Sequence, residues 1–253
     1  MPEHGIQVAG DAESRKRRFL MVVDSDSDSL SYLSVLLNRF NYPSFKATSA
    51  QEAIETAATA VPFLVVTSLH LPDMHGFDLM QQFKENLATS HIPIIAVSRQ
   101  EDLNVRKRCL DMGAVGCIYH PVEAETLYRV VQVAVEKNPR SCMRVRTTKP
   151  VKVNDERHDT FYGAYTLDLS ERGMFLRTVN SAPLNTALSL QIDLNGRIIP
   201  AVAEVLYSCK EGTGPYQEPG IGLKFSRIEP KDQEFLRIFI QNEVMRGIRP
   251  SNA

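Results

Sequence analysis

The sequence of 253 residues lacks tryptophan and contains few cysteines. Its four cysteines are Cys109, Cys117, Cys142 and Cys209, and no two of them form a CxxC pair. The pattern therefore indicates neither a disulfide framework nor a cysteine-based zinc site, because both use cysteines at recurring short spacings. We expect reduced thiols and a cytoplasmic protein.

A long apolar run and a strong net charge are also absent. No uninterrupted apolar stretch approaches the roughly 18 residues that a membrane span requires, so membrane insertion is not expected. The net charge of −1 argues against a globally basic nucleic-acid binder, and DNA is not an expected partner. Residues 1–17 are polar and lack the apolar segment of a secretory signal, so we expect a disordered tail there.

Residues 18–138 alternate short apolar stretches with longer amphipathic ones. Strands are expected at 19–23, 44–48, 63–67, 92–98 and 115–119, and helices at 24–40, 50–60, 76–87, 101–113 and 125–137. Five strand–helix repeats of this size predict an α/β fold, in which a five-stranded, doubly wound parallel sheet carries helices on both faces.

The periodicity changes after Pro139, so a second domain is expected at residues 139–253. Strands are expected at 149–154, 164–170, 174–179, 188–194, 197–208 and 220–226, and one helix at 231–245. Turn signals such as Asn195-Gly196 separate the strands. This succession predicts an antiparallel β-barrel with a C-terminal helix packed on it.

Polar residues follow the strands of the first domain. The carboxyl ends of parallel strands meet at one edge of a sheet, so Asp24, Asp26, Ser68, Ser98 and His120 are expected to lie together. The stretches VVDSD, LPDMHG, AVS and YHP, at these strand ends, make this half resemble the receiver domain of bacterial response regulators.

The resemblance implies a metal site and a phosphoacceptor that this sequence does not keep in full. In that family two acidic residues after the first strand and an aspartate after the third hold a divalent metal. The third-strand aspartate accepts a phosphoryl group, which a hydroxyl residue and a lysine contact. Asp24 and Ser98 stand at two of these positions, whereas Ser25 replaces the second acid, Ser68 the phosphoacceptor and His120 the lysine.

These losses predict a degenerate pocket, although Asp26 lies next to the replaced acid. A serine hydroxyl is a weak nucleophile without an activating base, and magnesium prefers anionic oxygens. The aromatic residue that often responds to phosphorylation would fall near Cys117 and is absent, and Asp73 should lie in the loop beyond the strand. Phosphorylation through Ser68 is therefore not expected; the alternative is that His120 activates Ser68 or binds a transition metal with Asp24.

Two short motifs stand out in the second domain. Arg140 and Arg144 form RxxxR directly after the linker, and Asp168, Ser170 and Gly173 form DxSxxG at the end of an apolar strand. Each motif alone is a weak signal. Together, and before a six-strand pattern that ends in a helix, they resemble the PilZ domain, a receptor for cyclic di-GMP.

The chemistry of these residues suits that ligand. Arginine forms forked bonds to phosphate oxygens and to guanine O6 and N7, and it stacks on base faces. Asp168 can accept bonds from guanine N–H groups, and Ser170 can bond to base or phosphate. Gly173 would allow a tight turn without a Cβ. Arg146 and Lys149 are additional candidates, for which solvated charge is the simpler interpretation.

The sequence therefore predicts a cyclic di-GMP-binding effector without enzymatic activity or cofactor, in which a receiver-like scaffold is fused to a ligand-binding barrel. By resemblance, the ligand bridges the linker arginines and the DxSxxG turn, and it changes the interdomain geometry and the binding of protein partners. A homodimer through the receiver-like domain is one such partnership. The alternatives are a phosphorylation-independent interaction scaffold and a response regulator with atypical phosphorylation.

Overall fold

The structure is a computed structural model that describes residues 19–137, 139–140, 142–155, 162–180, 182–213 and 216–248. The tail predicted at residues 1–17 lies outside the described residues. The described chain forms two compact units, one of which contains residues 19–140 and the other residues 142–244. The boundary predicted between residues 138 and 139 stays a prediction.

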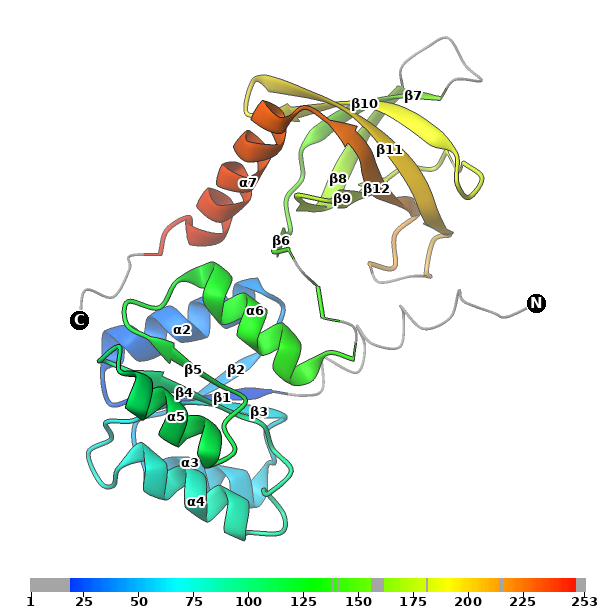
Figure 1. The fold of residues 1–253 in the computed structure, drawn as a ribbon. Coiled ribbons are helices and arrows are strands. Elements are labelled where there is room, and N and C mark those ends of the chain that lie inside the picture. The colour runs from blue at the N-terminus through cyan, green and yellow to red at the C-terminus, as the bar shows by residue number, and fades with distance from the viewer. Residues whose placement is uncertain are drawn as a thin grey trace. The chain divides into compact units, whose positions relative to one another are not determined.

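The first unit contains a five-stranded parallel sheet (Figure 1). Its strands are β1 (Leu20–Val23), β2 (Ser44–Ala47), β3 (Leu64–Ser68), β4 (Ile94–Ser98) and β5 (Gly116–Tyr119). They lie in the order β2-β1-β3-β4-β5, and every position of β1, β3 and β4 is buried. Burial on both faces explains why these strands read as continuous apolar runs.

Helices cover both faces of this sheet, as the sequence predicts. They are α2 (Ser27–Arg39), α3 (Ala50–Thr59), α4 (Gly76–Glu85), α5 (Leu103–Asp111) and α6 (Ala124–Val135). In Figure 1, α2 and α6 lie on one face, and α3, α4 and α5 lie on the other. Helix α2 buries Leu30, Leu33, Leu36 and Leu37, which recur at the spacing of one helix face. The parallel α/β fold is thus confirmed.

The second unit is a closed antiparallel barrel. Its six strands are β7 (Pro150–Asp155), β8 (Tyr162–Ser170), β9 (Gly173–Arg177), β10 (Ala187–Leu194), β11 (Arg197–Cys209) and β12 (Gly220–Ile228). They pair in the order β8-β7-β10-β11-β12-β9, and a β8–β9 pairing closes the circle. Alternate residues of β10 are buried, which is the pattern of a strand with one face in a core. The predicted barrel is confirmed.

A short strand that the sequence analysis does not predict precedes the barrel. This strand, β6 (Arg144–Val145), pairs with β8 in antiparallel register, so that Arg144 lies opposite Ser170 and Val145 opposite Leu169. Two residues are too few to show an alternating pattern. The burial of Met143 and Val145, on either side of Arg144, holds this stretch of the chain against the barrel.

Helix α7 (Pro230–Met245) packs on the barrel through Leu236, Phe239 and Ile240, which are buried. Arg197, at the start of β11, donates to Asp232 Oδ1 at 2.8 Å, and its guanidinium lies 4.0 Å from the centroid of the Phe235 ring. These contacts tie the first turn of the helix to the β10–β11 hairpin. The C-terminal helix predicted for this domain therefore packs on the barrel as expected.

Glycine is needed at two positions of the barrel for different structural reasons. Gly196 follows Asn195 in the β10–β11 turn, and both residues have positive φ, 91° and 59°, as a two-residue hairpin turn requires. Gly173 begins β9, and a Cβ there would lie 2.1 Å from the Leu223 carbonyl oxygen of β12. The absence of a Cβ at Gly173, which the sequence analysis links to a tight turn, therefore also permits the close approach of two strands.

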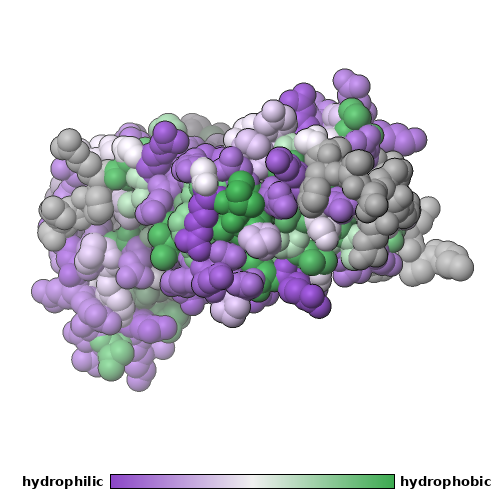
Figure 2. All heavy atoms as spheres, turned by 90° about the horizontal axis from the view of Figure 1, so that it is seen from above, coloured by the Kyte–Doolittle hydropathy of each residue, from purple (hydrophilic) through white to green (hydrophobic). Residues whose placement is uncertain are grey.

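The surface mixes polar and apolar side chains. Much of the face drawn in Figure 2 is hydrophilic, with hydrophobic side chains between the polar ones. Among the described residues, no helix has both the length and the apolar character needed to cross a membrane.

The close approach at Gly173 yields a stability test. We expect Gly173→Ala to lower the free energy of unfolding of the barrel by about 1–3 kcal/mol, because the added methyl group overpacks a backbone contact. Gly163→Ala is the matched control, since no atom lies within 4 Å of a Cβ at that position. Denaturant unfolding of both variants measures the difference, and equal stabilities would contradict the packing argument.

Candidate functional site

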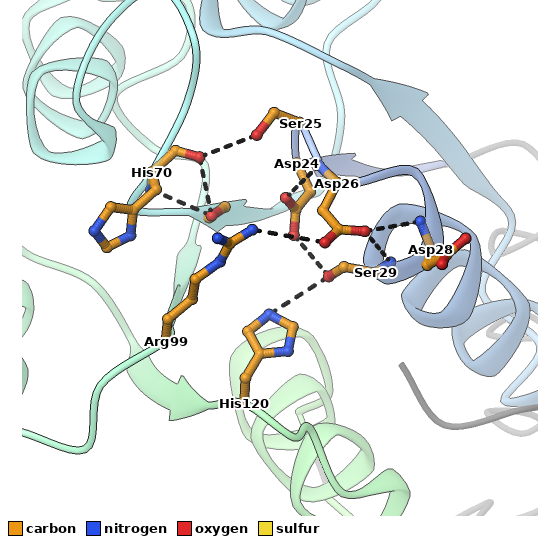
Figure 3. Close-up of polar contacts among 9 residues, drawn as sticks. Asp24, Ser25, Asp26, Asp28, Ser29, His70, Arg99 and His120 are labelled. Carbon is orange, nitrogen blue, oxygen red and sulfur yellow. Dashed lines mark hydrogen bonds and ion pairs between the residues drawn. The ribbon is translucent and has the colours of Figure 1, made fainter. Parts of the chain in front are cut away.

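The first candidate site lies at the carboxyl edge of the parallel sheet. Figure 3 shows Asp24 and Asp26 between β1 and α2, with Arg99 and His120 approaching from the ends of β4 and β5. Ser68 and Ser98 are the last residues of β3 and β4. The topology thus brings the five residues predicted from the sequence, together with Arg99, to one edge.

A chain of polar contacts links Asp24 to His120. Ser29 Oγ donates to Asp24 Oδ2 at 2.7 Å, and His120 Nε2 lies 3.4 Å from Ser29 Oγ (Figure 3). The Ser29 hydroxyl has a single hydrogen, which it donates to the Asp24 carboxylate. His120 Nε2 must therefore be the donor in its contact with Ser29. Nδ1 is then unprotonated in the neutral ring, and among the described residues this buried atom has no hydrogen-bond partner.

Asp26 is occupied as a helix cap. Its Oδ1 accepts from the backbone N–H groups of Asp28 and Ser29 at 2.9 and 3.1 Å, and its Oδ2 lies 3.6 Å from Arg99. The two backbone hydrogen bonds lower the pKa of Asp26, with a smaller contribution from Arg99. The carboxylate next to the replaced acid therefore stabilises the start of α2.

The serines of this edge bond mainly to nearby backbone. Ser68 Oγ donates to the His70 carbonyl at 3.3 Å and accepts from its N–H at 3.2 Å, and Ser98 forms the same pair of contacts with Gln100. Ser25 Oγ lies 3.4 Å from the His70 carbonyl. The Ser68 and Ser98 contacts are local turn interactions of the kind that hydroxyl side chains commonly make.

The arrangement offers little support for phosphoryl transfer. The Ser68 hydroxyl bonds to the His70 backbone, whereas His120 Nε2 contacts Ser29. Asp73 accepts from the backbone N–H groups of Ala50 and Gln51 at 3.0 and 2.7 Å, so its carboxylate binds the start of α3. Within the described ranges, no group of three or more histidine, cysteine, aspartate or glutamate side chains could hold a metal ion.

The second candidate site lies on the rim of the barrel. Strand β6 places Arg144 opposite Ser170, and the guanidinium NH1 of Arg144 lies 3.4 Å from Asp168 Oδ2. One arginine of RxxxR thus contacts the aspartate of DxSxxG, 24 residues away in sequence. The strand pairing is the physical cause of this contact.

Asp168 is buried and has a second partner. The Tyr216 hydroxyl donates to the same Oδ2 at 2.6 Å. Burial raises the pKa of Tyr216, and the Asp168 charge adds to this effect, so the hydroxyl stays a donor across the physiological range. Two donors of different kinds therefore converge on one carboxylate oxygen.

Ser170 and Gly173 have structural roles in the β8–β9 turn. Ser170 is buried, and its hydroxyl donates to the Gly173 carbonyl at 2.9 Å. Gly173 permits the contact with β12 described above. These two residues shape the turn that presents Asp168, and direct contacts with a ligand stay predictions for both.

The remaining cationic candidates differ in their surroundings. The Arg140 backbone N–H donates to Gln132 Oε1 at 2.9 Å, within the first unit. The Arg146 guanidinium lies 5.6 Å from the centroid of the Tyr216 ring. Lys149 Nζ donates to Asn195 Oδ1 at 2.8 Å and lies 5.3 Å from the Phe239 ring, so Lys149 belongs to the packing around α7.

Sequence reasoning missed three residues of these sites. Ser29 and Arg99 contact the two acidic side chains of the sheet edge, and Tyr216 contacts Asp168. Tyr216 lies in a stretch rich in glycine and proline between β11 and β12, to which the sequence analysis assigns no site residue. An aromatic residue within such a stretch was the one available signal.

The chain matches two families in succession. Residues 20–132 match the family described as "Response regulator receiver domain", and residues 137–242 match the family described as "PilZ domain". The fold and the two sites define a two-domain signalling protein. More particularly, the chain is a response regulator receiver domain followed by a PilZ domain.

Relatives and solved structures match the receiver domain. The "Two-component response regulator ORR7" of Oryza sativa subsp. japonica is 26% identical over 113 residues, which cover 44% of this chain and 54% of that protein. A "Probable cyclic di-GMP phosphodiesterase" of Vibrio cholerae is 28% identical over 108 residues, 43% of this chain and 24% of that protein. The match thus spans about half of the first relative and a quarter of the second.

Among solved structures, chemotaxis response regulator CheY4 of Vibrio cholerae is similar with a TM-score of 0.44 and 20% identity. The match covers 46% of this chain and 98% of that one. A putative response regulator from Chloroflexus aurantiacus has a TM-score of 0.46 and 22% identity, over 47% of this chain and 98% of that one.

The pocket geometry predicts a pH dependence at His120. Burial lowers the pKa of His120 from its ordinary value of 6.5; Arg99 acts in the same direction, and Asp24 and Asp26 oppose it. The unfolded chain therefore binds a proton at His120 more readily than the folded chain does. The neutral ring contributes fully to the free energy of unfolding above about pH 6.5, the pKa in the unfolded chain. This contribution is lost as the pH falls through the lower pKa of the folded state.

We expect the free energy of unfolding to fall more between pH 7.5 and 5.5 in the wild type than in His120→Gln. Urea unfolding at the two pH values measures both slopes. A histidine ring resonance that is absent from His120→Gln and that titrates above the ordinary value would contradict the prediction.

Proposed function

We propose that this protein is a cyclic di-GMP receptor whose ligand is held by Arg140 and Arg144 of the linker and by the DxSxxG turn, Asp168, Ser170 and Gly173. Ligand binding changes the geometry between the two domains and thereby the binding of a protein partner. The single observation that carries this proposal is the contact between Arg144 and Asp168.

That contact supports the proposal because it unites two motifs with complementary chemistry. An arginine beside a carboxylate offers donors for phosphate and for guanine O6 and N7, together with an acceptor for guanine N–H groups. Asp168 is buried at the barrel rim, where a water-poor surrounding strengthens charge-assisted hydrogen bonds. A guanine-containing dianion matches this set better than a purely anionic ligand does, since the carboxylate repels phosphate.

The position of Arg140 explains how a bound ligand would affect the linker. Its backbone is bound to Gln132 of α6, whereas Arg144 belongs to a strand of the barrel sheet. A ligand that engages both arginines couples the segment after α6 to the barrel. The switch is then a change in the order and direction of a short connector.

The receiver domain in this proposal serves as a scaffold and partner surface. The polar groups at its sheet edge bond to one another and to the local backbone, and Ser68 stands where the family implies an aspartate. Input through the barrel, and not through phosphorylation, accounts for both sites. Partners through this domain, a second copy of the chain included, are part of the proposal.

Arg144 and Asp168 provide the test of the binding site. We expect Arg144→Ala and Asp168→Ala each to weaken cyclic di-GMP binding by roughly 5- to 150-fold, the range of about 1–3 kcal/mol that bidentate guanine contacts are worth. Isothermal titration with the full chain measures this, with GTP as the ligand control.

Arg227→Ala is the matched control variant, because Arg227 is an exposed arginine of the same barrel. Its affinity should equal that of the wild type. Unchanged affinity in both Arg144→Ala and Asp168→Ala, with the fold intact by circular dichroism, would refute the proposed site.

Small-angle scattering tests the proposed input. We expect cyclic di-GMP to change the scattering profile of the wild type, because the ligand orders the linker, and to leave the profile of Arg140→Ala unchanged. A small phosphodonor with Mg²⁺ should change neither profile nor intact mass. A profile that responds to the phosphodonor and not to cyclic di-GMP would instead support the response regulator with atypical phosphorylation.

A further inference from the structure

Tyr216 lies in a defined site on the barrel rim. Its hydroxyl donates to Asp168 Oδ2 at 2.6 Å, and its ring centroid lies 4.7 Å from that of Phe175 and 5.6 Å from the Arg146 guanidinium. The side chain therefore has a polar partner at its tip, an aromatic neighbour and a nearby cation. All of these groups belong to the same compact unit.

This environment has the chemistry of a guanine subsite. A guanine base donates N–H groups at one edge to a carboxylate and presents flat faces on which arginine and aromatic side chains stack. Tyr216 offers an O–H donor to the same carboxylate, and its ring has the same two kinds of neighbour, with Arg146 over its face and Phe175 as a tilted ring beside it. The acceptor that the proposed function assigns to guanine is thus already bound.

We infer that Tyr216 is a base surrogate: in the ligand-free protein its hydroxyl holds the Asp168 carboxylate, and a guanine base of the ligand displaces it. The inference rests on the proposed function and adds a residue that tunes affinity. The Tyr216 hydroxyl competes with the ligand, and its contact with Asp168 keeps a buried carboxylate satisfied until the base arrives.

The effect of removing the Tyr216 hydroxyl on ligand affinity distinguishes a competing role from a supporting one. If the hydroxyl merely oriented Asp168 for the ligand, its removal would weaken binding, because an unsatisfied buried carboxylate would lose its position. If the hydroxyl competes, its removal frees the carboxylate and strengthens binding. The direction of the change therefore separates the two roles, and loss of folding cannot produce a gain in affinity.

The experiment is titration of the full chain and of Tyr216→Phe with cyclic di-GMP. The variant keeps the ring and removes the hydroxyl, and we expect its Kd to be about tenfold lower, which corresponds to about 1.4 kcal/mol. Tyr165→Phe is the matched control, since Tyr165 is an exposed tyrosine of β8, the strand that carries Asp168, and its affinity should not change. Melting temperatures verify that all three proteins are folded.

The outcomes separate this inference from the function on which it rests. Tighter binding by Tyr216→Phe supports the surrogate role, and so does binding that only this variant shows. Saturable wild-type binding with equal or weaker binding by Tyr216→Phe overturns the surrogate role and leaves the receptor intact. The absence of binding in both proteins overturns the receptor and the inference together.

Discussion

The pairing of β6 with β8 is the constraint on which the barrel site depends. Met143 and Val145 are buried, so the residue between them, Arg144, is held at the rim opposite Ser170. Residues opposite each other in an antiparallel pair have Cα atoms only about 4.5–5.5 Å apart. Two apolar side chains therefore determine where a linker arginine meets the DxSxxG turn, and the polar contact with Asp168 follows from their burial.

The two candidate sites use their carboxylates in different ways. In the receiver domain, Asp24 and Asp26 bind serine, backbone and arginine groups that the pocket itself provides. Those bonds include a helix cap, whose loss costs about 1 kcal/mol, so an incoming ligand would compete with the fold. At the barrel rim, Asp168 instead bonds to two side chains, Arg144 and Tyr216, which can change partners without breaking a strand or a helix.

Most of the fold could be predicted from sequence because its elements are long and periodic. The buried strands appear as apolar runs, α2 shows one leucine face, and Asn195-Gly196 specifies its own turn. Strand β6 escaped prediction because two residues carry no period. The neighbour that excludes a Cβ at Gly173 could not be predicted, since the Leu223 carbonyl is 50 positions away in the chain.

The same limit applies to the sites. Motif spacing identified Arg144 and Asp168 as candidates. Tyr216 contacts Asp168, and Arg99 contacts Asp26, only through the tertiary fold. A sequence motif identifies side chains that could bind a ligand. It does not identify the side chains that bond to those residues when the ligand is absent, because such partners form no local pattern in the sequence.

A buried carboxylate at a binding rim must be satisfied in both states of a receptor. In the proposed receptor, the affinity would be the difference between the ligand's bonds to Asp168 and those of the internal partner, and not the strength of either set alone. An internal partner also keeps the site ordered before binding, which limits the entropy that the ligand must offset. A receptor built in this way binds its ligand less tightly, and in return it has a defined ligand-free conformation. A signalling domain needs such a conformation if a partner is to distinguish ligand loss from ligand binding.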